Sequence, residues 1–132
     1  MIVQNMTSSN AGYGLFGNGL SFLCERMTFT QCGGHGVVAW NTKGRLINCV
    51  ITQCEGCGIF CYDNALIELE GSQTKVDGND TSENGNYGLR TSDTSSTIHL
   101  LFPLTKESVS TNNNGGGNYN SKGTIQTVDT LE

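Results

Sequence analysis

The chain has 132 residues, a formal net charge of −5 and only seven lysine and arginine residues. Its length predicts one domain, and so few cations are a poor electrostatic match for nucleic acid or an anionic membrane surface. No apolar run approaches the roughly 20 residues of a membrane-spanning helix, so we expect no membrane insertion.

A 22-residue repeat runs through the first part of the chain. The pattern Gly-x-Gly-aliphatic occurs three times, with its second glycine at Gly14, Gly36 and Gly58. Three further sets are expected to follow the same step: Ser8, Thr30, Thr52, Thr74; Asn10, Cys32, Cys54, Val76; and Gly12, Gly34, Gly56, Gly78. A fixed period of this length indicates stacked supersecondary units, each of which buries its apolar face against its neighbours.

The content of one repeat indicates the kind of stack. Residues 50–71 contain three short β-rich runs separated by corners of Gly, Asp and Asn, and they show no helical period. The signature of a leucine-rich repeat is absent. The sequence therefore predicts an all-β, right-handed parallel β-helix of about five coils.

The later part of the chain departs from the repeat. Gly88-Leu89 continues the pattern after a step of 30 residues, so the loop 77–86 is expected to carry about eight extra residues. Further strands are expected at 97–101, 105–110 and 123–128, with a flexible Asn/Gly-rich stretch at 112–120. The expected organisation is a single domain with regular coils over 1–78, a coil with a loop insertion over 79–104 and an irregular closing coil over 105–132.

The run from Cys54 to Ile67 resembles the parallel β-helix repeat of the pectate-lyase-like superfamily. It is most similar to the non-catalytic repeat of NosD-type proteins and β-helix F-box proteins. The resemblance covers residues ~5–100 and implies the fold far more strongly than a function. The segment that follows Pro103 resembles the closing segment of large β-helix proteins of algae, stramenopiles or their viruses.

Aromatic side chains are expected on the outer face of one sheet. Strand alternation points Leu15, Val37, Ile59 and Leu89 inward. It points Phe16, Trp40, Phe60 and Tyr62 outward. Three interpretations of this candidate binding face stay open: the C-terminal tail folds back over it, a protein partner buries it, or a glycan stacks on it.

All six cysteines lie between residues 24 and 61. The repeat favours a stack of buried thiols over disulfides or zinc, because Cys32, Cys54 and Cys61 fall at positions occupied by small inward residues in other coils. Cys57 shares its position with Tyr13, His35 and Tyr87, so we expect it to face outward and to be the most reactive thiol.

The sequence does not bring together the catalytic groups that pectin-active β-helices use, so we expect neither an enzyme nor a cofactor. His35 stands in a Gly-His-Gly segment, but Asp63 is expected to stand alone on its coil and Arg45 to lack a basic partner. The loop 77–84 has acids that could bind calcium loosely, although a solvated polar loop is the favoured interpretation. Asn5 and Asn79 head glycosylation sequons.

These observations favour a structural or interaction module of an extracellular, cell-surface or virion assembly. Open solenoid ends expose strand edges, so protein partners or further coils of a longer parent are expected to cover them. The alternative is a polysaccharide-binding or polysaccharide-active domain that uses the aromatic face.

Overall fold

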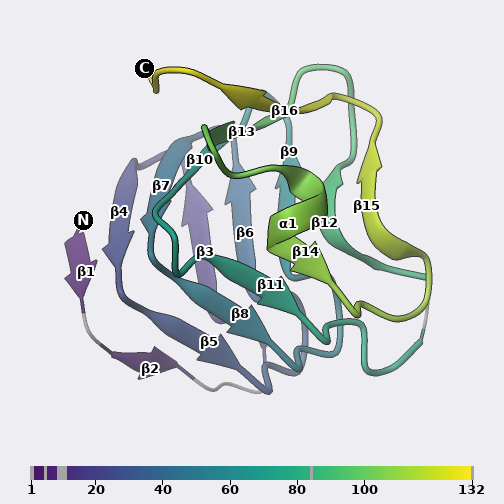
Figure 1. The fold of residues 1–132 in the computed structure, drawn as a ribbon. Coiled ribbons are helices and arrows are strands. Elements are labelled where there is room, and N and C mark those ends of the chain that lie inside the picture. Colours follow the sequence, from purple (N-terminus) through teal and green to yellow (C-terminus); the bar gives the residue numbers. More distant parts are fainter. Residues whose placement is uncertain (1, 5, 9–11, 84, 132) are drawn as a thin grey trace.

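The protein is an all-β solenoid of about five turns with ~23 residues per turn (Figure 1). The computed structural model describes residues 2–4, 6–8, 12–83 and 85–131. Three parallel sheets run along the stack, and each coil contributes one strand to each sheet. The predicted fold is thus confirmed.

The strands of the three sheets are as follows. The first sheet has β1 (Ile2–Gln4), β4 (Phe22–Glu25), β7 (Lys43–Ile47), β10 (Leu66–Glu70), β13 (Thr97–Leu101) and β16 (Thr124–Val128). The second sheet has β2 (Thr7–Ser8), β5 (Thr28–Thr30), β8 (Val50–Thr52), β11 (Lys75–Asp77) and β14 (Ser110–Thr111). The third sheet has β3 (Leu15–Asn18), β6 (Val37–Trp40), β9 (Ile59–Tyr62), β12 (Tyr87–Thr91) and β15 (Gly117–Ser121).

Strand alternation fills the interior as the sequence predicts. Val37, Ile59 and Leu89 are fully buried in one core cluster, and Leu15 packs against it. Phe60, their neighbour on β9, is half-buried and lies outside that cluster. Each coil turns through three corners, and the residue after most strands adopts a left-handed backbone conformation. These residues are Arg26, Asn48 and Gly71; Gln31, Gln53, Gly78 and Asn112; and Gly19, Asn41 and Asp63.

The two glycines of the repeated motif make room for the neighbouring coil. A Cβ at Gly36 would lie 2.4 Å from Ile51 Cγ2 and 2.7 Å from the Gly58 carbonyl oxygen. A Cβ at Gly34 would lie 2.9 Å from the ring of Tyr13. The second glycine of the motif therefore permits close stacking of the backbones, and the first accommodates an aromatic ring.

Part of the expected alignment is wrong in the fourth coil. Val76 pairs with Ile51 rather than following Cys54, and the step from β8 to β11 is 25 residues. The corner between β9 and β10 supplies one of the three extra residues, and a turn at residues 71–74, in which the Thr74 N–H donates to the Gly71 carbonyl, supplies the other two. The corner position of Cys32 and Cys54 is continued by Asn79, so Thr74, Val76 and Gly78 do not occupy the expected positions.

The alignment of the first coil also shifts. Ser8 pairs with Phe29 rather than Thr30, a step of 21 residues. Asn10 lies outside the described residues. The fourth coil regains the motif at Leu89, which pairs with Ile59 as expected.

The secondary structure of the closing coil differs from the prediction at two places. Lys106–Val109 forms the short helix α1 where a strand was expected, because Thr105 and Ser108 form a capping box. Residues 117–120, which were expected to be flexible, form most of β15, and this strand pairs with β12. The last strand, β16, lies where it was predicted and pairs with β13.

Candidate functional site: an aromatic ladder on the third sheet

The outer face of the third sheet carries a continuous group of rings, which we call the aromatic ladder. It comprises Tyr13, Phe16, His35, Trp40, Phe60 and Tyr62. The four residues predicted from the sequence therefore lie together, and Tyr13 and His35 join them from the corner before the strands. Val38, which pairs with Phe16 and Phe60 on the neighbouring strands, is only 2% exposed although it lies on the outer side of β6.

The rings of successive coils stack face to face. Phe16 and Trp40 have centroids 6.4 Å apart and an interplanar angle of 6°, and Trp40 and Tyr62 have centroids 5.7 Å apart at 9°. The Trp40 Nε1–H also donates to Asp63 Oδ2 at 2.7 Å. These contacts occupy the ring faces that a sugar would need for stacking. Phe16, on the first coil, is the most exposed of the four predicted residues at 44%.

His35 links two coils as a hydrogen-bond acceptor. Its ring stacks on Tyr13 at 5.4 Å, and its Nδ1 accepts the N–H of Cys57 at 2.8 Å. Burial, together with the charge of Arg90, lowers the pKa of His35 to about 4. The half-buried, neutral ring is thus part of the stack rather than a free surface group.

The prediction that Cys57 is an exposed and reactive thiol is wrong. Cys57 lies outside the core cluster but is 0% exposed. Its Sγ accepts the N–H of Tyr87 at 3.4 Å, as His35 does for Cys57 one coil earlier. Burial raises the pKa of this thiol, so it is protonated and poorly nucleophilic. Arg90, which lies over the rings of Phe60 and Tyr87, is the charged neighbour of this position.

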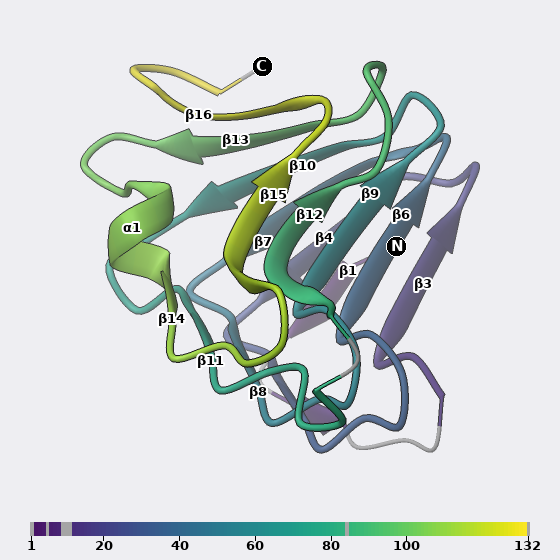
Figure 2. The same cartoon turned by 90° about the vertical axis from the view of Figure 1, so that its right-hand side faces the viewer.

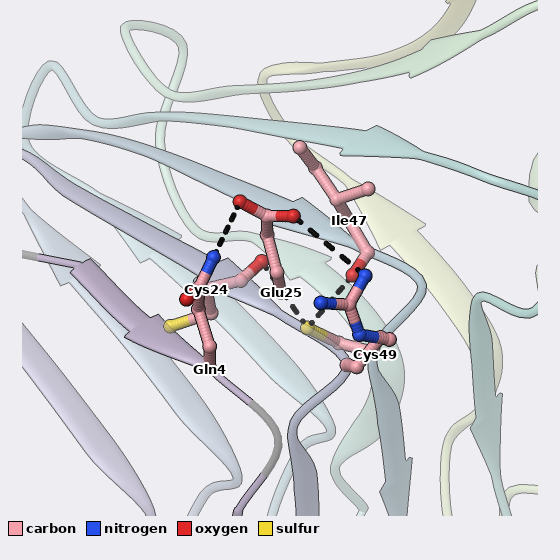
Figure 3. Close-up of polar contacts among 6 residues, drawn as sticks. Gln4, Cys24, Glu25, Ile47 and Cys49 are labelled. Carbon is pink, nitrogen blue, oxygen red and sulfur yellow. Dashed lines mark hydrogen bonds and ion pairs between the residues drawn. The ribbon is translucent and has the colours of Figure 1, made fainter.

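All six cysteines are free and buried. Burial raises the pKa of Cys54 to about 12, against the opposing effect of a hydrogen bond with the Cys32 backbone. Burial likewise raises the pKa of Cys61, which pairs with Ala39 inside the third sheet. Figure 3 shows the surroundings of two further thiols: Cys49 Sγ donates to the carbonyl oxygens of Cys24 and Ile47, each at 3.5 Å. The arrangement is that of stacked thiols, without a disulfide.

The C-terminal tail does not fold back over the aromatic ladder. Its strands β15 and β16 extend the third and first sheets at the end of the stack away from β3 (Figures 1 and 2). The interpretation in which the tail covers the ladder is therefore wrong.

A buried ion cluster lies on the outer side of the first sheet, and it corrects one expectation. Glu68 is 0% exposed, and its Oε1 lies 3.3 Å from Arg45 Nη2 and 3.6 Å from Lys43 Nζ. Arg45 therefore has a basic neighbour, Lys43, although none was expected from the sequence. Both cations surround one carboxylate, so they stabilise its charge.

The acidic groups of the corners are also engaged in hydrogen bonds. Asp63 has a second aspartate beside it on the next coil, and the Asp63 N–H donates to Asp93 Oδ2 at 2.8 Å. In the loop, buried Asp80 accepts the N–H of Asn86 at 3.1 Å, and Asp77 accepts the hydroxyl of Thr111 at 2.7 Å. Among the described residues, no three His, Cys, Asp or Glu side chains gather as a metal site would require.

Asn79 is a structural corner residue that sequence reasoning missed. It is 0% exposed; its Oδ1 accepts the N–H of Cys54 at 3.1 Å, and its Nδ2 donates to the Ile51 carbonyl at 3.0 Å. Asn113 repeats the arrangement by accepting the N–H of Asn79 at 2.9 Å. The sequon at Asn79 is therefore inaccessible in the folded chain, and the sequon at Asn5 lies outside the described residues. One sequence signal could have indicated this role: Asn79 directly follows a corner residue, as Cys32 and Cys54 do in the preceding coils.

The geometry defines a parallel β-solenoid with an aromatic ladder on one face. Comparison of the chain with family models, curated proteins and solved structures yields no match in any of the three. In the part of the chain that the structure describes, no helix is long and apolar enough to cross a membrane.

Proposed function

We propose that the chain is a structural and interaction module whose first coil is covered by a protein partner or by further β-helix coils. The observation that carries this proposal is the distribution of exposed apolar side chains. Of the seven large hydrophobic residues that are exposed in the described part of the chain, five belong to the first coil. They are Ile2, Met6, Tyr13, Phe16 and Leu20. Several exposed apolar side chains on one coil are typical of a surface that another segment or partner covers.

The engagement of the polar groups supports a role without catalysis. His35 accepts a backbone hydrogen bond, and Glu68 is buried between Arg45 and Lys43. Each of these groups interacts with a neighbouring coil. Its interactions therefore stabilise the solenoid rather than the binding of a substrate.

The first test is the association of the 132-residue chain. We expect concentration-dependent complexes in sedimentation velocity, and we expect Met6→Glu with Leu20→Glu to abolish them, because a charge at an apolar interface must be desolvated. A wild-type chain that stays monomeric at high concentration would count against the proposal, as would turnover of uronic-acid polymers.

A polysaccharide-binding role is the second candidate, and one observation favours it. Phe16 and Tyr13 are 44% and 43% exposed, so the rings at the start of the ladder are the most accessible to a sugar. A glycan array with wild type, Phe16→Ala and Trp40→Ala tests this role. Binding that is lost in Phe16→Ala would favour it over coverage of the first coil by a partner or by further coils.

A further inference from the structure

A loop insertion marks one corner of the solenoid. The register step grows from 25 residues at β11 to 30 residues at β12, so five residues are inserted between these two strands. In repeat proteins such insertions lie on one face, which is often the binding face. The corner that this loop covers is therefore a candidate binding site.

Hydrogen bonds hold the loop against the corner of the preceding coil. The Asp80 N–H donates to the Gly56 carbonyl oxygen at 2.9 Å. The Ser82 hydroxyl donates to the Glu55 carbonyl oxygen at 2.8 Å. These bonds fix the position of the loop, so a site beside it is already formed in the chain alone.

A cavity of about 300 Å³ lies between this loop and the corners of the coils before it. It is lined by Tyr13, Gly33, Gly34, His35, Glu55, Gly56, Ser82 and Asn86. Seven of these eight residues belong to the second, third and fourth coils, so the cavity lies on the flank of the stack rather than at an end. Its volume is at the lower limit of ligand pockets and suits a group the size of a single six-membered ring.

Two rings form one wall of this cavity, and glycines make room for them. A Cβ at Gly34 would lie 2.9 Å from the Tyr13 ring, and a Cβ at Gly56 would lie 2.6 Å from His35 Nδ1. The rings of Tyr13 and His35 stack with their centroids 5.4 Å apart. This aromatic wall offers apolar surface against which C–H groups of a ligand can pack.

The cavity has hydrogen-bond donors. Because His35 Nδ1 accepts the Cys57 N–H, the proton of the neutral ring lies on Nε2, which makes that nitrogen a donor. Asn86, whose Oδ1 lies 3.7 Å from Cys57 Sγ, carries its donors on Nδ2. A ligand in this cavity therefore needs acceptor atoms.

The cavity also has acceptors, and its charge is negative. The single proton of the Ser82 hydroxyl has the Glu55 carbonyl oxygen and Asp80 Oδ1 as acceptors, at 2.8 and 3.4 Å, so toward a ligand this hydroxyl acts as an acceptor. Of the eight lining residues, Glu55 alone has a charged side chain, since the His35 ring is neutral. A carboxylate accepts hydrogen bonds and repels an anionic ligand.

We infer that this corner binds a sugar residue of a neutral glycan. Each hydroxyl of a sugar both donates and accepts, so it pairs with the donors and the acceptors of the cavity, while C–H groups of the sugar ring pack on the aromatic wall. A uronate is disfavoured, because its carboxylate would meet Glu55 and none of the eight lining residues is a lysine or arginine. The inference goes beyond the proposed function and does not depend on what covers the first coil.

Saturation-transfer NMR tests the site, with maltotriose, cellotriose, laminaritriose and mannotriose as neutral probes. Wild type is expected to transfer saturation to at least one of them and none to trigalacturonate. Ser82→Tyr should weaken binding of that neutral probe at least about tenfold, because the larger side chain fills the cavity from the loop. Ser72→Tyr is the matched control, because Ser72 is an exposed serine in a turn at another corner, and it should leave binding unchanged.

A second pair of variants separates this corner from the rest of the aromatic ladder. Tyr13→Ala should also weaken binding, whereas Trp40→Ala should not, because Trp40 belongs to the ladder but does not line the cavity. Circular dichroism checks that each variant keeps its β content.

Three results would overturn the inference. Binding that is lost in Trp40→Ala but kept in Ser82→Tyr would assign the sugar to the ladder, and equal loss in Ser82→Tyr and Ser72→Tyr would remove the link to the cavity. Folded wild type that binds no neutral probe, or that binds trigalacturonate alone, would exclude a neutral glycan. The sedimentation test of the proposed function stands apart from each of these results.

Discussion

At the scale of single residues, one register position explains His35 and Cys57 together. Each side chain accepts the backbone N–H of the residue one coil further on, at 2.8 Å for His35 Nδ1 and 3.4 Å for Cys57 Sγ. A buried backbone N–H without an acceptor is costly. The corner therefore favours a side chain that can accept a hydrogen bond. This requirement accounts for the histidine and the cysteine at this position without assigning either a catalytic role.

The lowered pKa of His35 predicts acid sensitivity. The folded chain keeps this ring neutral down to about pH 4, whereas in the unfolded chain it takes up a proton near its ordinary pKa of about 6.5. His35 thus contributes stability above pH 6.5 that is lost as the pH falls toward 4. For a partly exposed ring we expect the loss to be about 1 kcal/mol.

Urea unfolding of wild type and His35→Gln at several pH values measures this contribution. Glutamine can also accept the Cys57 N–H but does not titrate, so the variant should lose this part of the pH dependence. An identical pH dependence in both proteins would show that His35 does not titrate in this way.

The glycines of the motif predict a contrast between two coils. Gly36→Ala should destabilise the fold by about 1–3 kcal/mol, because its Cβ would collide with Ile51 and with the backbone of Gly58. Gly12→Ala is the control, since nothing lies within 4 Å of a Cβ built there. Thermal unfolding compares the two, and equal stability would refute the close-packing account.

At the scale of elements, β7 and β10 are joined outside the core by the Glu68 cluster. Arg45 and Glu68 are register partners on these adjacent strands. The carboxylate has no exposed surface, and both cations lie within 3.6 Å of it. By contrast, exposed Arg26 lies 3.9 Å from half-buried Glu25 (Figure 3 shows the surroundings of Glu25).

These two ion pairs predict very different effects of the same substitution. Arg45→Met should lower the free energy of unfolding by about 2 kcal/mol. It removes one of the two cations of the cluster, and Lys43 is the cation that still lies beside the buried Glu68 carboxylate. Arg26→Met, the control, should change it by less than about 0.5 kcal/mol. Chemical denaturation of both variants gives the comparison, and a similar effect for the two would contradict the importance assigned to burial.

At the scale of the whole molecule, the burial of the thiols predicts their chemistry. All six cysteines are free and buried, so a thiol reagent such as Ellman's reagent should modify none of them rapidly in the native chain and all six after unfolding. A reducing agent should leave the midpoint of thermal unfolding unchanged. Rapid modification of one native thiol, or a lower midpoint on reduction, would contradict the structure.

The sequence by itself determined the fold and the outer rings. The 22-residue step and strand alternation placed Ile59 inside and Phe60 outside, because parallel coils in register force equivalent side chains to stack. The same step placed Phe16, Trp40 and Tyr62 near one another. It also placed Cys57 with His35 and Tyr87.

Only the tertiary structure decided what covers each position. Cys57 was expected to be exposed, but the coil that follows covers it, and register alone cannot show this. Asn79 and the Lys43–Arg45–Glu68 cluster were missed because their partners come from coils of unequal length. The step of 25 residues into β11 breaks the period that sequence alignment relies on. A repeat specifies which side chains recur, whereas burial depends on insertions that the repeat does not contain.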